Sequence, residues 1–163
     1  MSLQSKNFLF KRTEKDDSVL HHKDSDYWGE GNVDYMWNEV SEPLPASGYY
    51  GSTNGLHTIA FILRSFIGRV YLQGTLSSQP EEDDWFTIEL DGNEYIEMND
   101  SVMDHPDREN VLMRHGFTGT KSFSVKGNFT YLRVGISRNY ISTEPSLLQK
   151  QVSGKVEEVL INY

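Results

Sequence analysis

The feature that most restricts the fold of this chain is an alternation of apolar and polar residues near its middle. From position 69 to 76 the even-numbered residues are Val, Leu, Gly and Leu, whereas the odd-numbered ones are Arg, Tyr, Gln and Thr. Successive side chains of a β-strand point to opposite faces, so this pattern predicts a strand with one buried face, to which Leu76 belongs. Residues 57–64 are apolar on both parities, which predicts a central strand covered on both sides.

Turn signals between further apolar stretches predict two hairpins. Asp91-Gly92 stands between the stretches 85–90 and 94–98, and Asp-Gly is the preferred sequence of a two-residue hairpin turn. Residues 126–128, Lys-Gly-Asn, stand between the stretches 117–125 and 129–137 in the same way. The second of those stretches places Leu132, Val134 and Ile136 on one face.

Residues 155–163 predict a closing strand, in which Val159, Ile161 and Tyr163 alternate with other residues. Together with the stretches above, about seven strands are expected, separated by turns that glycine marks. This number and spacing favour an all-β fold, an antiparallel β-sandwich or jelly roll, over a fold that mixes helices and strands. Short helical turns are expected after Pro106 and over residues 145–150.

The first 45 residues differ from the rest and predict an extended N-terminal arm, followed by a sandwich domain over residues 46–163. Charges of both signs crowd the segment 11–26, and Pro43-Leu44-Pro45 closes the arm with a stiff turn. Its aromatic residues are Tyr27, Trp28, Tyr35 and Trp37. Two interpretations stay open, because these rings either pin the arm to its own domain or dock on a neighbouring subunit.

Composition limits the possible partners. The chain has 163 residues, 15 Lys and Arg against 24 Asp and Glu, and a net charge of -9. An acidic protein repels phosphate backbones and anionic lipids, so we expect neither nucleic acid nor membrane as a partner. Cysteine is absent, which excludes disulfides, thiolate metal sites and a cysteine nucleophile. No signal peptide or apolar run of membrane-spanning length is expected.

The sequence predicts no catalytic or metal site. Residues 81–84, Glu-Glu-Asp-Asp, lack the spacing of an EF-hand loop, and adjacent carboxylates do not supply the separation that glycoside hydrolysis needs. A solvated turn is favoured over a calcium site. The five histidines show no zinc-binding spacing, and His57 is interpreted as a strand-end residue satisfied by backbone or water. We therefore expect a non-enzymatic protein without a cofactor.

Three aromatic residues are candidates for stacking on sugar rings. Tyr49 and Tyr50 lie in a glycine-rich loop, and Trp85 follows the acidic turn. Exposed aromatic rings are how a β-sandwich commonly binds carbohydrate. The alternative for Trp85 is packing at the edge of the sandwich, because it opens a strand-like stretch.

A succession of short motifs runs through the last two thirds of the chain: Gly55–Ile59, Phe66–Val70, Gln73–Leu76 with Pro80, Asp84–Phe86, Phe123–Phe129, Leu132–Val134, Ser153–Val156 and Ile161–Tyr163. This succession resembles a family of small β-sandwich virion structural proteins of tailed bacteriophages, especially T-even-like phages of marine hosts. Their order and spacing carry the resemblance, which spans about residues 48–163 and leaves the arm unmatched. In outline such proteins also resemble galactose-binding-like jelly rolls.

The resemblance implies a building block of a virus particle. It predicts a multi-copy or homo-oligomeric protein, made in the bacterial host cytoplasm and located in the virion, with other virion proteins as partners. The tail or baseplate is the expected position, with capsid decoration or the neck as the alternative. The other alternative is a carbohydrate-binding or host-receptor recognition module that uses Tyr49, Tyr50 and Trp85. The resemblance offers no catalytic residues.

Overall fold

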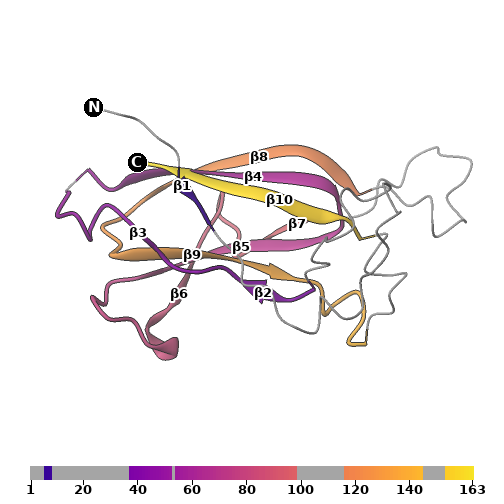
Figure 1. The fold of residues 1–163 in the computed structure, drawn as a ribbon, viewed down its shortest axis with the longest axis horizontal. Coiled ribbons are helices and arrows are strands. Elements are labelled where there is room, and N and C mark those ends of the chain that lie inside the picture. Colours follow the sequence, from indigo (N-terminus) through magenta and orange to yellow (C-terminus); the bar gives the residue numbers. More distant parts are fainter. Residues whose placement is uncertain (1–5, 9–36, 53, 99–115, 145–152) are drawn as a thin grey trace, which may run out of the picture.

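The computed structural model describes residues 6–8, 37–52, 54–98, 116–144 and 153–163. Within these residues the chain forms two antiparallel sheets that pack face to face, as Figure 1 shows. The predicted all-β sandwich is thus confirmed, and its jelly-roll connectivity stays a prediction. The helical turns expected after Pro106 and over residues 145–150 lie outside the described residues.

The first sheet contains three long strands and the second contains two. The first sheet has the order β1 (Lys6–Asn7), β10 (Lys155–Asn162), β4 (Leu56–Phe66) and β8 (Phe117–Lys126). In the second sheet β9 (Tyr131–Ser137) pairs with β5 (Gly68–Thr75). Short strands flank this pair: β2 (Glu39–Val40) and β3 (Leu44–Pro45) on β9, and β6 (Phe86–Ile88) and β7 (Ile96–Met98) on β5. The second sheet is therefore flanked by short strands on both sides, whereas the first sheet ends in the short β1 on one side and the long β8 on the other.

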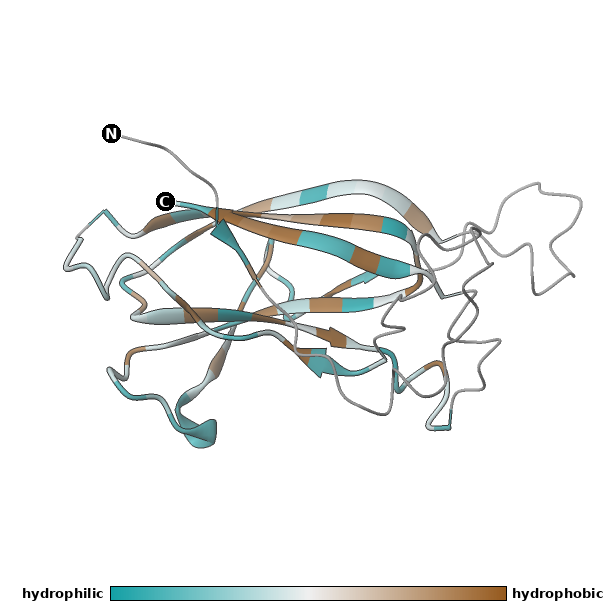
Figure 2. Ribbon diagram, in the orientation of Figure 1, coloured by the Kyte–Doolittle hydropathy of each residue, from teal (hydrophilic) through white to brown (hydrophobic). Residues whose placement is uncertain are grey.

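The core lies between the two sheets. Figure 2 shows hydrophobic residues alternating with hydrophilic ones along β10 and β5. The inward-facing apolar residues of the long strands are Ile59, Phe61, Leu63, Val70, Leu72, Phe123, Val125, Leu132, Val134, Ile136, Val156, Val159 and Ile161, all buried. Alternation with a two-residue period is thus what turns these strands into two layers. The predicted shared face of Leu132, Val134 and Ile136 is confirmed.

Two predictions about burial were wrong. β4 is central, as expected, between β10 and β8, but only one of its faces is covered. Thr58 and Arg64 are exposed on the outer face, and Ile62 is only half-buried. Leu76 is 67% exposed because β5 ends at Thr75, so the chain leaves the sheet before Leu76 can face the core. Tyr163 is likewise exposed, since it follows the end of β10.

The expected hairpin at Asp91-Gly92 is half right. Asp91 and Gly92 both have positive φ, at 51° and 80°, and Leu90 and Asn93 exchange two backbone hydrogen bonds around them, as in a tight two-residue turn. The flanking strands, however, do not pair with each other. β6 and β7 each pair with β5, so residues 89–95 form an excursion from the edge of the second sheet.

The second expected hairpin is wrong. β8 pairs with β4 in the first sheet, whereas β9 pairs with β5 in the second. The turn at 127–130 therefore carries the chain from one sheet to the other. Local alternation cannot distinguish a hairpin from such a crossover, because both need the same turn residues and the same period.

Parts of the expected arm are strands of the sandwich. β1 pairs with β10, and β2 and β3 pair with β9. Phe8 is buried in the core, where its amide donates to the carbonyl of Val159. Residues 9–36 lie outside the described residues, so the boundary between an arm at 1–45 and a domain at 46–163 stays a prediction.

Candidate binding surface

Large polar and aromatic side chains line the outer face of the second sheet. Alternation sends Arg69, Tyr71 and Gln73 outward from β5 and Tyr131 and Arg133 outward from β9. The antiparallel register sets Gln73 opposite Arg133 and Tyr71 opposite Gly135. Side chains two residues apart on one strand are about 6.7 Å apart, so these groups form one continuous surface.

Arg133 organises one end of this surface. Its Nε donates to Gln73 Oε1 at 2.7 Å and its Nη2 donates to Glu82 Oε1 at 3.1 Å. Its guanidinium also lies 4.3 Å from the ring centroid of Trp85. The hydrogen bond to Arg133 lowers the pKa of the Glu82 carboxyl, because it favours the charged form.

Arg69 organises the other end in the same way. Its Nε donates to Glu97 Oε1 at 2.7 Å, and this bond raises the pKa of the guanidinium. Its guanidinium lies 4.4 Å from the ring centroid of Tyr95 and 4.1 Å from that of Tyr140. Two rings and a carboxylate thus fix a side chain that would otherwise sample many rotamers.

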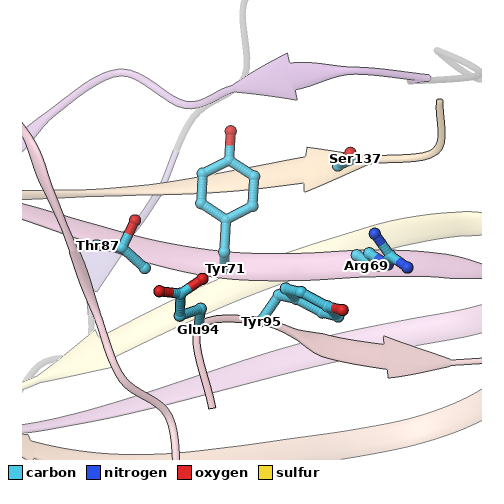
Figure 3. Close-up of a pocket in the computed structure, with 6 residues that line it drawn as sticks. All are labelled: Arg69, Tyr71, Thr87, Glu94, Tyr95 and Ser137. Atoms are coloured by element: carbon cyan, nitrogen blue, oxygen red, sulfur yellow. The ribbon is translucent and has the colours of Figure 1, made fainter. Parts of the chain in front are cut away.

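Tyr71 lies between the two arginines. A Cβ added at Gly135 would overlap its ring, so the ring needs the glycine opposite it. Burial raises the pKa of the Tyr71 phenol, which therefore stays protonated at neutral pH. Tyr71 lines a pocket of about 260 Å³, and Figure 3 shows the side chains around it. The residues that line the pocket are Arg69, Tyr71, Thr87, Glu94, Tyr95 and Ser137.

Tyr49 and Tyr50, two of the predicted sugar-binding residues, are exposed in the turn before β4. Their rings contact each other with centroids 5.0 Å apart, and Tyr49 also contacts Tyr131 at 5.5 Å. Tyr50 instead lies against Tyr163, and Lys6 Nζ donates to both phenol oxygens at 3.0 and 2.8 Å. These hydrogen bonds raise the pKa of Lys6, and Lys6 lowers that of Tyr50.

Tyr49 and Trp85 each contact an outward-facing residue of β9, whereas Tyr50 lies between Tyr49 and Tyr163. Tyr49 contacts Tyr131 and Trp85 lies under Arg133, and these two β9 residues are two positions apart on the same face. Trp85 is partly covered by Arg133, so only part of its ring is open to a ligand. Tyr49, Tyr50 and Trp85 therefore offer less open ring surface for stacking on a sugar than the sequence led us to expect.

Trp37 packs inside its own sandwich. It is 8% exposed, and its Nε1 donates to the carbonyl of Ser142 at 3.0 Å. Its ring also lies near the buried guanidinium of Arg138. For this residue, pinning to its own domain is the interpretation that the contacts favour. The other aromatic residues of the expected arm, Tyr27, Trp28 and Tyr35, lie outside the described residues.

The groups considered for chemistry have structural partners. Residues 82–84 form a short 3-10 turn in which the amide of Glu81 donates to Asp84 Oδ2 at 2.7 Å. His57 is fully buried; Ser47 N donates to its Nε2 at 3.2 Å, and its Nδ1 lies 2.9 Å from the Gly55 carbonyl, so backbone partners satisfy it as predicted. Over the ranges that the structure describes, no three His, Asp or Glu side chains gather as metal ligands.

Sequence reasoning missed the residues that build the pocket. The alternation did place Arg69 and Tyr71 on the outer parity of their strand, and that was the available signal. Nothing local indicated that Tyr95 and Tyr140, far apart in the sequence, would both stack on Arg69. That meeting depends on the excursion at 89–95 and on the turn after β9.

Comparison with known proteins identifies no relative. No protein-family model matches the chain, and no curated protein matches it. Across the described residues, no helix combines the length and the apolar character required to span a membrane.

Proposed function

We propose that this protein is a non-enzymatic virion structural protein of a tailed bacteriophage, located in the tail or baseplate. The observation that carries the proposal is the ordered set of motifs that resembles such proteins. These motifs fall on the strands and turns of one sandwich: Gly55–Ile59 opens β4, Gln73–Leu76 ends β5, and Ser153–Val156 leads into β10. A shared order of strand-forming segments is what a common fold requires, although fold alone does not specify function.

The edges of the sheets support assembly with other chains. β6 and β7 are three residues each and are separated by the excursion at 89–95, which blunts that edge of the second sheet. β8, by contrast, is ten residues long, and among the described residues it pairs with a strand on one side only. A long edge strand can accept a strand from another chain by backbone hydrogen bonding.

The proposal is tested on particles of the phage whose genome encodes the chain. Mass spectrometry of purified particles should detect it at a fixed copy number, and cryo-electron microscopy should show a two-sheet density at a symmetric position in the tail or baseplate. Density in the capsid or neck would favour the alternative positions. Absence of the protein from purified, infectious particles would overturn the proposal.

A second candidate is a carbohydrate-binding or host-receptor recognition module. The observation that favours it is the row of aromatic rings on the outer face of the second sheet, where Tyr49, Tyr131, Trp85 and Tyr71 lie near polar side chains. Amphipathic rings beside hydrogen-bonding groups suit ligands that have both apolar faces and hydroxyls. A glycan array probed with the full chain tests it, and a flat response across neutral and charged glycans would count against it.

A further inference from the structure

The pocket beside Tyr71 has the shape and chemistry of a site for one small ligand. Its volume is about 260 Å³, just below the range typical of pockets for drug-sized molecules. Figure 3 shows the rings of Tyr71 and Tyr95 on two sides, with the carboxylate of Glu94 and the hydroxyl of Thr87 near them. A single compact molecule with both an apolar face and polar groups would fit such a space.

Two of the side chains that line the pocket, Arg69 and Tyr71, are held in place before any ligand arrives. Arg69 is fixed by Glu97 and by the rings of Tyr95 and Tyr140. Tyr71 is half-buried against the backbone of Gly135, where a larger residue would displace it. A site whose side chains are already ordered loses less conformational entropy on binding, which favours recognition over accidental contact.

The charges around the pocket argue against an ionic ligand. Arg69 is the cation of the pocket, and it is already paired with Glu97 at 2.7 Å. Glu94 adds a further carboxylate, and within the described part of the chain it pairs with no cation. An anion would meet an excess of carboxylate, whereas a cation would be repelled by the guanidinium of Arg69.

We propose that this pocket binds one ring of a neutral saccharide, which packs a C–H face on Tyr71 or Tyr95 and shares hydroxyls with Arg69, Glu94 and Thr87. An arginine donates hydrogen bonds to sugar hydroxyls and a carboxylate accepts hydrogen bonds from them, so the two together can bind an uncharged sugar. The inference rests on the glycan-recognition candidate and moves its binding site from Tyr49, Tyr50 and Trp85 to this pocket.

Nuclear magnetic resonance titration of the 15N-labelled full chain tests the inference. The neutral probes are D-glucose, D-galactose, D-mannose and N-acetyl-D-glucosamine, and the charged probes are D-glucuronate and D-glucosamine. At least one neutral sugar should shift the amides of Thr87, Glu94 and Tyr95, with a dissociation constant of the order of 1 mM. Preference for either charged probe, or no shift with any sugar, would overturn the inference.

Two variants and a matched control locate the site. Tyr95→Ala removes an exposed ring of the pocket and should weaken binding roughly tenfold. Glu94→Gln keeps the shape of an exposed side chain and should weaken binding less, so it serves if Tyr95→Ala fails to fold. Tyr50→Ala removes a ring that packs on Tyr163, outside the pocket, and should leave binding unchanged.

The control also separates this inference from the candidate on which it rests. If sugar binding is lost in Tyr50→Ala and kept in Tyr95→Ala, glycan recognition stands and the pocket is wrong. If no sugar shifts the amides of the unaltered chain but the glycan array responds, the pocket is wrong and glycan recognition stands; if both are flat, both are wrong. The virion assignment is tested separately on particles and does not depend on either result.

Discussion

The two sheets present the same kind of residue to the core and different kinds to the outside. Inward, both carry rows of Ile, Leu, Val and Phe. Outward, the first sheet carries short side chains such as Thr58 and Ser124, whose hydroxyl oxygens lie 3.3 Å apart, and scattered charged residues such as Arg64. The second sheet carries Tyr71 and Arg133, each in contact with groups from other segments.

This difference concentrates the side chains that can form a pocket on one of the two sheets. The short hydroxyl side chains of the first sheet do not extend far enough to form the walls of a pocket. Long side chains can, provided that neighbouring rings and carboxylates hold them. We therefore expect that substitutions on the inner faces act on folding in both sheets alike, whereas outer-face substitutions matter mainly on the second sheet.

Truncation of a core residue should give the largest effect, and it should be similar in either sheet. Phe61→Ala in the first sheet should reduce the free energy of unfolding by about 3–5 kcal/mol, and Leu132→Ala in the second by about 2–5 kcal/mol, because both side chains are buried and leave a cavity. Urea unfolding measures both. If one of the two variants lost less than about 1 kcal/mol of unfolding free energy, the inner faces of the two sheets would not contribute equally to stability.

Gly135→Ala should give the next largest effect and should act through the outer face of the second sheet. The added Cβ would overlap the ring of Tyr71, so we expect a loss of about 1–3 kcal/mol in the free energy of unfolding. In the double variant Tyr71→Ala with Gly135→Ala the losses should be less than additive, because the clash is gone. Ser122→Ala on the first sheet is the control, expected within about 0.5 kcal/mol of the unaltered chain. Additive losses would show that the ring does not depend on the glycine.

The buried His57 should make the core sensitive to pH. Desolvation lowers its pKa below the ordinary 6.5 in the folded protein, so the unfolded chain binds more protons between these two pKa values. The free energy of unfolding should therefore fall as the pH drops from 6.5 through the folded pKa. Urea unfolding at several pH values measures this slope. His57→Gln, which does not titrate, should flatten it, and an equal slope in that variant would assign the effect to other groups.

Substitutions that remove an ion pair on an outer face should have the smallest effects on stability. The effect should be larger on the second sheet than on the first. Arg133→Gln breaks contacts with Glu82, Gln73 and Trp85, so it should lower the thermal midpoint slightly. Arg64→Gln on the first sheet removes an exposed pair with Glu157 at 3.6 Å and should leave the midpoint unchanged. Differential scanning calorimetry compares them. A larger shift for Arg64→Gln would contradict the proposed asymmetry of the two outer faces.

The sequence allowed the fold class and the positions of most strands to be predicted. It was less successful in predicting which strands pair with each other. Alternation identified the buried face of β9, and Asp91-Gly92 identified a tight turn. The same signals paired β8 with β9 wrongly, because a turn of a given length serves a hairpin and a crossover between sheets equally well. Of the candidate binding residues, Tyr49 and Trp85 do lie on one face, whereas Tyr95 and Tyr140 had no local signal.

By itself, the sequence determined which side of β5 and of β9 is apolar, because a two-residue period is a local property of the chain. For β4, which is apolar on both parities, it did not. Only the tertiary structure decided that β5 lies beside β9, with Gly135 opposite Tyr71 and with rings from two distant segments on Arg69. The physical reason is that strand partners are selected by the packing of whole layers. The free energy of that packing depends on all the inner-face residues together and is not encoded in any single segment.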